Sequence, residues 1–275
     1  MTTRIAVPSK GRLKEGTLTL LKDAGLQFEA TDRALAVPVR NAEMELLFVR
    51  TDDIPELVTD GVADLGVTGQ DLLAEYGSDL VELVELGYGQ CRLAAAVPRI
   101  DEAEKLEDLA GRRLATSHPR ATRRVLEERS IEATVVPLRG SVEVAPKLGV
   151  ADAVVDLVSS GSTLLQNGLR EVGTLIDSQA VLVATEERAE SEATRRLSTA
   201  LASVVQARRQ RYVLLNAPKD AVPEIVDLMP GLGSPTVVPE ADASLVAIHA
   251  VVERDAVWDL LPKLRSAGAT GILVL

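Results

Sequence analysis

The sequence has few of the residues that build disulfide frameworks, zinc sites or aromatic binding surfaces. Its 275 residues include one cysteine, Cys91, two histidines, His118 and His249, and 2% aromatic side chains. A single cysteine excludes an internal disulfide framework, and two isolated histidines lack the spacing of a zinc site. We therefore expect no metal centre built from the soft ligands of the chain itself.

The chain also lacks long apolar runs and an excess of positive charge. No segment approaches the roughly 18 apolar residues of a spanning helix, and residues 1–4 lead into a strand without an apolar signal segment. The formal net charge of -11 disfavours a nucleic-acid partner, because that binding relies on clustered cations. We expect a cytoplasmic protein, not bound to a membrane, that meets anionic ligands through a local cationic pocket.

Apolar residues are abundant but come in short segments. They make up 46% of the chain, enough for more than one core at this length. Up to residue 185, short strands alternate with helices, which predicts parallel sheets with right-handed crossovers. Over residues 212–275 the order becomes βαββαβ, which is typical of a ferredoxin-like domain. The strands of the first part are expected at residues 4–8, 45–49, 63–68, 93–97, 113–116, 133–137, 152–158 and 181–185, with a helix at 141–148.

Residues 152–164 combine an apolar strand with a turn of small residues. Gly161 lets the backbone approach a ligand closely, nearby hydroxyls add donors, and amides of a helix starting near Thr163 can point at an anion. Asp156, just before the turn, suits ribose hydroxyls. A phosphate site and an ordinary strand-loop-helix with a Ser or Thr cap are about equally compatible with this pattern.

Charged residues follow the first strands. Lys10 and Arg12 in the turn after residues 4–8 either hold a phosphate or form a solvated basic turn. Arg50 ends the next strand, and its planar guanidinium suits a pyrophosphate. Asp53 is expected to cap a helix, and for Asp71 capping is favoured over presenting a carboxylate to a ligand.

These motifs together match one family. They are the segment Pro8–Leu13, the segments Arg50–Pro55 and Asp64–Asp71, and a signature that contains Glu143, Gly149, Ala151, Asp156, Gly161 and Thr163. The chain thereby resembles, over nearly its whole length, the ATP phosphoribosyltransferase family, which opens histidine biosynthesis. Its length and tail are similar to the long, self-regulated form.

The resemblance implies an α/β fold: a bilobal catalytic core like type II periplasmic binding proteins, followed by a ferredoxin-like (βαββαβ) regulatory domain that binds histidine. The first lobe would comprise residues 1–92 with 179–210. The second lobe would comprise residues 93–178 with the phosphoribosyl pyrophosphate loop, and the regulatory domain residues 211–275. Dimers that assemble into hexamers are implied as well.

The implied reaction transfers the phosphoribosyl group of phosphoribosyl pyrophosphate to N1 of ATP, with Mg²⁺ held chiefly by substrate phosphates and with L-histidine as inhibitor. The residues implied are Asp156, Arg50 and Lys10 for catalysis; Asp152, Ser159, Ser160, Gly161, Ser162, Thr163, Leu164 and Glu143 for phosphoribosyl pyrophosphate; Arg12, Asp71, Gly69 and His118 for ATP; and Asp220, Leu232, Ser234 and Thr236 for histidine.

Several alternatives stay open. The family usually has tyrosine where His118 stands, so this ring either stacks on or donates to a nucleotide, or faces solvent at the start of a helix. Asp220 either pairs with an ammonium or caps its helix, and the loop 230–236 is either an effector loop or a plain turn. A non-catalytic bilobal receptor for anions and a stand-alone amino-acid sensor are the competing function classes.

Overall fold

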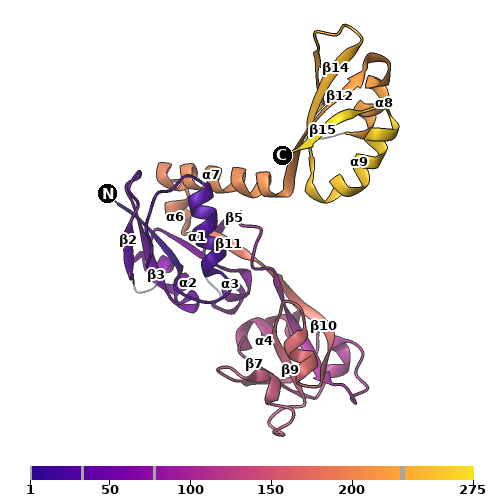
Figure 1. The fold of residues 1–275 in the computed structure, drawn as a ribbon. Coiled ribbons are helices and arrows are strands. Elements are labelled where there is room, and N and C mark those ends of the chain that lie inside the picture. The colour runs from indigo at the N-terminus through magenta and orange to yellow at the C-terminus, as the bar shows by residue number, and fades with distance from the viewer. Residues whose placement is uncertain (1, 32–33, 77–78, 230–232) are drawn as a thin grey trace. The chain divides into compact units, whose positions relative to one another are not determined.

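Alternating apolar residues along the chain form three sheets, which belong to two compact units, residues 1–202 and 203–275. The computed structural model describes residues 2–31, 34–76, 79–229 and 233–275. Figure 1 traces the chain through both units. None of the helices in these described ranges has both the length and the apolar surface that membrane crossing requires.

The first sheet brings three strand ends to one edge. Its strands are β1 (Thr3–Pro8), β2 (Ala36–Pro38), β3 (Met44–Val49), β4 (Leu65–Gly69), β5 (Val81–Glu85) and β11 (Ala180–Ala184), in the order β2-β3-β1-β4-β11-β5. Because β1 pairs in parallel with both β3 and β4, the turns that follow these three strands lie next to one another. The accompanying helices are α1 (Lys14–Asp23), η1 (Thr51–Asp53), α2 (Ile54–Thr59), α3 (Gln70–Tyr76), α6 (Glu186–Ala189) and α7 (Glu192–Arg209), the last of which continues past residue 202.

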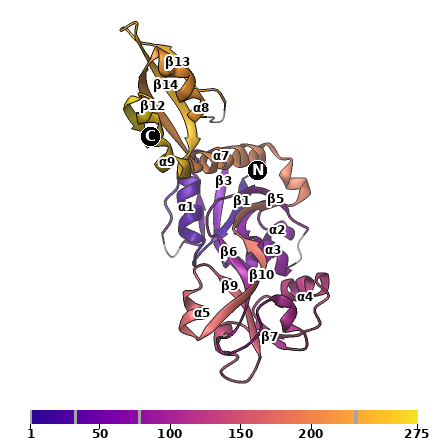
Figure 2. The ribbon, with the colours of Figure 1, turned by 90° about the vertical axis from the view of Figure 1, so that its right-hand side faces the viewer.

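The chain enters the second sheet through one long strand and leaves it through another. Its strands are β6 (Cys91–Pro98), β7 (Arg113–Thr116), β8 (Thr134–Pro137), β9 (Ala153–Val158) and β10 (Leu169–Ser178), in the order β10-β6-β9-β7-β8. Its helices are η2 (Leu106–Leu109), α4 (Pro119–Glu128), η3 (Val142–Val144) and α5 (Ser162–Gln166). The chain enters through β6 and returns through its antiparallel partner β10 to β11. Figure 2 shows β6 and β10 side by side. The two sheets correspond to the two lobes expected from the sequence. The prediction of parallel sheets is only partly right, because β11 pairs antiparallel with β4 and β5, and β6 pairs antiparallel with β9 and β10.

Successive side chains of β9 point to opposite faces of the sheet, and this alternation decides which of them face the loop that follows the strand. Ala153 and Val155 belong to one core cluster of the second lobe, whereas Val154 and Val158 belong to the other. Asp156 has the same parity as Val154, so it lies on the second face, the one that also packs against Val142 and Leu164. The pleat therefore directs Asp156 toward the segments that carry Glu143 and the loop 159–164.

Several features of local structure in this unit differ from the expectations. The strands β2, β5 and β10 were not predicted; β2 and β5 are short edge segments with little alternation, and β10 has two irregularities in its register. The helix expected at residues 141–148 is wrong, because only the single turn η3 forms there. Ser141 has a positive φ of 49°, and Pro146 has no N–H to donate to a helical hydrogen bond, so the segment does not propagate as an α-helix.

The second unit has the predicted βαββαβ order. Its elements are β12 (Gln210–Pro218), η4 (Lys219–Ala221), α8 (Val222–Leu228), β13 (Thr236–Pro239), β14 (Leu245–Glu253), η5 (Arg254–Ala256), α9 (Val257–Ser266) and β15 (Thr270–Val274). All sheet pairs are antiparallel, in the order β13-β14-β12-β15, which is the ferredoxin-like arrangement. Alternate residues of β12 and β14 pack under the two helices, and one face of the sheet thus forms the core. The expected fold class is confirmed.

Candidate active site

A cavity of about 210 Å³ lies where the turns after β1, β3 and β4 approach the second lobe. It is lined by Gly11, Arg12, Leu13, Thr51, Asp52, Asp71, Leu72, His118 and Leu157. Three of the four residues predicted to bind ATP, Arg12, Asp71 and His118, therefore share one cavity. Binding residues commonly gather at this edge of open α/β sheets because several strands end there.

Asp71 lines this cavity and is almost fully buried, with 1% of its surface exposed. The Ser178 hydroxyl donates to Asp71 Oδ1 at 2.5 Å, and Arg12 Nη2 lies 3.3 Å from the same oxygen. Burial alone would raise the pKa of this carboxyl, but its contacts with the His118 ring, the Ser178 hydroxyl and the Arg12 guanidinium hold the pKa below its ordinary value. Asp71 is thus held as a carboxylate inside the cavity wall.

The prediction that Asp71 caps its helix is wrong. The residue lies within α3, and its carboxylate faces Ser178 and Arg12 instead of the first amides of the helix. Gly69 explains how the carboxylate fits: a Cβ atom there would lie 2.2 Å from Asp71 Oδ1. The glycine therefore leaves space for the carboxylate, which is a reason for its presence that does not require ligand contact.

His118 lies against Asp71 and is buried, with 6% of its surface exposed, so the solvent-facing interpretation is wrong. Its Nδ1 is 3.0 Å from the Ser117 hydroxyl, and its Nε2 is 3.5 Å from Asp71 Oδ2, a long contact. Nε2 has no hydrogen-bond partner among the described residues. A buried ring nitrogen of this kind is open to a partner supplied by a ligand.

Two exposed cations stand beside this cavity. Lys10 follows β1 and Arg50 follows β3, and the Ser9 backbone N–H donates to the Val49 carbonyl at 2.8 Å, which joins the two turns. Within the described part of the chain, neither side chain forms an ion pair, whereas Arg12 is committed to Asp71 and to the Gly89 carbonyl. The two unpaired side chains leave positive charge available for an anion.

Asp156 and Glu143 form the acidic side of the site. The Leu157 N–H donates to Asp156 Oδ1 at 2.8 Å. Burial raises the pKa of Asp156, the nearby charge of Glu143 adds to the increase, and the Leu157 N–H and His118 oppose it. The Asp156 carboxyl is half-buried and forms no ion pair with the described residues, which is the kind of perturbed group that gathers at functional sites.

The loop after β9 has the conformation that the sequence predicted for a close approach to a ligand. Gly161 has a φ of 77° and stands directly before α5, and the Ser160 and Ser162 hydroxyls are 3.0 Å apart. Ser159, Ser160, Ser162 and Thr163 are exposed. The N-cap position is Gly161, so the prediction of a Ser or Thr N-cap is wrong, although the Ser160 hydroxyl accepts a long hydrogen bond of 3.5 Å from the Ser162 N–H.

Two residues predicted to bind phosphoribosyl pyrophosphate do not present their side chains to a ligand at this loop. Leu164 is 5% exposed and packs in the core of the second lobe, so its side chain holds the end of the loop against that core. Asp152 lies at the opposite end of β9, about 20 Å away at ~3.3 Å per residue. There it accepts two hydrogen bonds from the Arg113 guanidinium and one from its backbone N–H.

Three residues of the site were not predicted from the sequence: Ser178, Leu157 and Glu75. Ser178 ends β10 and contacts Asp71 across 107 residues, a distance over which no local pattern exists. Leu157 was read as part of a buried strand, although it lines the cavity. Glu75 follows Asp71 by four residues, and this helical spacing was a usable signal that both carboxylates share one face of α3.

The residues predicted for histidine lie in the second unit. Asp220, Ser234 and Thr236 are exposed there, and Leu232 lies outside the described residues. Asp220 belongs to the turn η4, and Ala221 occupies the N-cap position of α8 without a side-chain cap. The capping explanation for Asp220 is therefore wrong, and its carboxylate is available to solvent.

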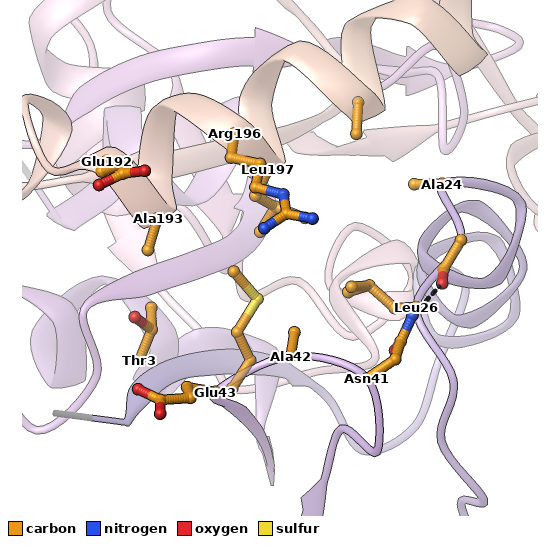
Figure 3. Close-up of a pocket in the computed structure, with 13 residues that line it drawn as sticks. Thr3, Ala24, Leu26, Asn41, Ala42, Glu43, Glu192, Ala193, Arg196 and Leu197 are labelled. Atoms are coloured by element: carbon orange, nitrogen blue, oxygen red, sulfur yellow. Dashed lines mark hydrogen bonds between the residues drawn. The ribbon is translucent and has the colours of Figure 1, made fainter.

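A second cavity, of about 430 Å³, lies at the opposite edge of the first sheet (Figure 3). Arg196 of α7 reaches into it above the starts of β1 and β3, with Glu43 and Glu192 toward one side. None of the described residues that line it belongs to the predicted site. It is thus separate from the cavity around Asp71.

Comparisons with known proteins agree with this geometry. Residues 50–205 match the family described as ATP phosphoribosyltransferase, and residues 207–275 match the HisG C-terminal domain. ATP phosphoribosyltransferases of Gemmatimonas aurantiaca and Parabacteroides distasonis are 46% and 41% identical, over 98% and 99% of this chain and 97% of each relative. The solved structure of the ATP phosphoribosyl transferase (HisG:HisZ) complex from Thermotoga maritima is 28% identical with a TM-score of 0.63, covering 74% of this chain and 99% of that one. The chain therefore belongs to the ATP phosphoribosyltransferase family, the enzymes of the first step of histidine biosynthesis, and carries the family's C-terminal regulatory domain.

Proposed function

We propose that the cavity around Asp71 receives ATP and that the loop after β9 receives phosphoribosyl pyrophosphate, so that adenine N1 attacks the ribosyl carbon and pyrophosphate leaves. The observation that carries this proposal is the position of Asp156 between the two. It is a half-buried carboxylate three residues before the loop, and His118, which lines the cavity, is close enough to influence its pKa.

The reaction needs no general base. Adenine N1 has a free lone pair at neutral pH, so the nucleophile requires no deprotonation, and the ~10²–10⁴-fold contribution of general-base catalysis can be absent. Alignment of two bound substrates can instead remove about 7–11 kcal/mol of the barrier. Such alignment would be provided by the cavity residues Arg12, Asp71 and His118 for one substrate and by the loop after β9 for the other.

Asp156 would stabilise the positive charge that develops on the ribosyl carbon as its bond to pyrophosphate breaks. Incomplete solvation of the carboxylate strengthens this interaction, because few water dipoles compete with the reacting centre. Glu143, close enough to raise the pKa of Asp156, would contact the ribose hydroxyls. Gly161 and the hydroxyls of Ser160, Ser162 and Thr163 would bind the 5-phosphate.

Lys10 and Arg50 would bind the departing pyrophosphate, since both cations are exposed and unpaired within the described structure. Mg²⁺ is the cofactor we infer for this step. Among the described residues, no three His, Cys, Asp or Glu side chains converge as a metal site, so Asp156 and Glu143 would add oxygen ligands to a coordination shell made mainly by substrate phosphates. The metal supplies charge neutralisation of the pyrophosphate.

The domains we assign are residues 1–92 with 179–210 for the first lobe, 93–178 for the second, and 211–275 for regulation. We also propose dimers that assemble into hexamers, in a cytoplasmic enzyme. Histidine would bind the second unit, its ammonium on Asp220 and its carboxylate near Ser234 and Thr236. A coupling of about 1–3 kcal/mol between this site and the active site would change apparent affinity ~5–150-fold.

The assay for the reaction is direct. The purified chain is mixed with ATP, phosphoribosyl pyrophosphate, Mg²⁺ and pyrophosphatase, and phosphoribosyl-ATP is followed. Folded protein that forms no product would contradict the proposal, and would favour a receptor or sensor.

The regulatory assignment is tested with paired variants. Asp220→Ala and Ser234→Ala should retain activity and weaken histidine inhibition. Asp255→Ala is the matched control, since Asp255 occupies the equivalent turn η5 before the other helix of this unit. Equal inhibition of all three variants, competitive with ATP, would move the effector site to the catalytic cavity.

A further inference from the structure

The buried carboxylate of Glu75 on α3 holds the first turn of α4. Its Oε2 accepts hydrogen bonds from the backbone N–H groups of Arg120 and Ala121, both at 2.9 Å, and the residue is 8% exposed. The helix α3 follows a strand of the first lobe, and α4 follows a strand of the second. The two hydrogen bonds therefore join the lobes.

The first turn of α4 depends on this outside acceptor. His118 occupies its N-cap position but forms no side-chain cap, and Pro119 has no N–H to offer. The next two amides, of Arg120 and Ala121, would be open if Glu75 did not accept from them. A carboxylate at this end also interacts favourably with the helix dipole.

Asp71 and Glu75 act on adjacent parts of α4. Their spacing of four residues places both on one face of α3. Asp71 contacts the His118 ring at 3.5 Å, while Glu75 holds the amides two and three residues later. The position of the His118 ring in the cavity is therefore set by a backbone segment that Glu75 fixes.

We propose that Glu75 is a positioning residue for the nucleotide, which it serves by fixing the start of α4 and so the place of His118 beside Asp71. The proposal rests on the assignment of this cavity to ATP. Glu75 does not line the cavity, so it acts through α4 and not by touching a substrate. Loss of the two hydrogen bonds to Glu75 should therefore weaken the binding of ATP, which lies against His118 in this proposal, more than the binding of phosphoribosyl pyrophosphate at the loop 159–164.

The alternative is that Glu75 only stabilises the fold. Leu126→Val is a matched control, because Leu126 lies on the same helix in the core of the second lobe and contributes to stability without accepting the α4 amides. Glu75→Gln retains an acceptor oxygen at the same reach, whereas Glu75→Asp is one methylene too short to serve both amides. These two variants also keep the test intact if Glu75→Ala does not fold.

Two measurements are made on the full chain: hydrogen exchange at the Arg120 and Ala121 amides, and KM for each substrate. Glu75→Ala and Glu75→Asp should expose both amides and raise KM for ATP roughly tenfold, with KM for phosphoribosyl pyrophosphate changed less than about twofold. Glu75→Gln should restore most of the protection and most of the affinity. Leu126→Val should lower the Tm and leave both KM values unchanged.

Equal KM changes in Glu75→Ala and Leu126→Val at a similar loss of Tm would overturn the proposal, as would unchanged protection of the two amides. Indistinguishable effects of Gln and Asp at position 75 would overturn the acceptor role. Hydrogen exchange does not require turnover. Its result therefore stays interpretable if the chain forms no phosphoribosyl-ATP, and failure of the proposed function is distinguishable from failure of this inference.

Discussion

The two ends of β9 carry the same residue types in opposite environments. At the amino end, Asp152 is half-exposed and paired with Arg113, which holds the pKa of Asp152 below its ordinary value. At the carboxyl end, Asp156 is more buried and burial raises its pKa. Each end also has a glycine with positive φ, Gly149 at 68° and Gly161 at 77°. One end is organised for stability, and the other keeps a carboxylate at some cost to stability.

Asp156→Asn should give the largest effect and separates the two ends most sharply. Removal of the charge should lower kcat by about 10²–10³-fold, the magnitude seen when one preorganised electrostatic group is lost. Because the carboxylate is incompletely solvated, the amide should keep or raise the Tm. Turnover and thermal unfolding of the same preparation provide the two readings. A lowered Tm with near-normal kcat would make Asp156 a structural residue.

Gly161→Val and Gly149→Val compare the glycines at the two ends of β9. A β-branched residue at a φ of 77° is strained by about 1–3 kcal/mol, and its side chain would also block approach to the loop. We expect KM for phosphoribosyl pyrophosphate to rise roughly tenfold or more. Gly149→Val is the control, since its backbone is similarly strained and a Cβ there meets nothing within 4 Å. It should lower the Tm with little change in KM; matching KM values for the two variants would count against the loop.

The sequence distinguished these ends only in part. The apolar run and the Ser-Gly-Ser turn predicted the strand, the loop and Gly161, because they depend on local backbone preferences. The roles of Asp152 and Asp156 depend on Arg113 and Glu143, whose positions come from β7 and η3, so a pattern along β9 could not separate them. Asp71 is a similar case, since Ser178 reaches it across 107 residues and replaces the predicted cap.

The pH dependence should also differ between the ends. The pKa of Asp156 is raised, so its ionisation costs stability that is present below its unfolded pKa and is lost as pH rises through the folded pKa. The pKa of Asp152 is lowered, so its contribution is present above the unfolded pKa and is lost as pH falls through the folded value.

In the proposed mechanism, activity requires the Asp156 carboxylate. The acid limb of kcat should therefore lie at a higher pH than a carboxyl of ordinary pKa would give, and it should disappear in Asp156→Asn while surviving in Asp152→Asn. A pH–rate profile of the three proteins checks this. An acid limb that persists unchanged in Asp156→Asn would assign the titration to another group.

Asp152→Asn should have the smallest effect. Its ion pair with Arg113 is 2.8 Å long, but the two side chains are 42% and 46% exposed, so solvent screens much of the interaction. Such solvent-exposed pairs contribute little net stability, and the asparagine oxygen can still accept from the Arg113 backbone N–H. We expect a slightly lower Tm and kcat and KM values within about twofold of the parent. The comparison with Asp156→Asn is the informative one, because the same chemical change four residues along one strand should leave turnover almost intact at one end and nearly abolish it at the other. A loss of turnover in Asp152→Asn similar to that in Asp156→Asn, in protein that remains folded, would mean that the amino end of β9 also serves the reaction and that the division between its two ends is wrong.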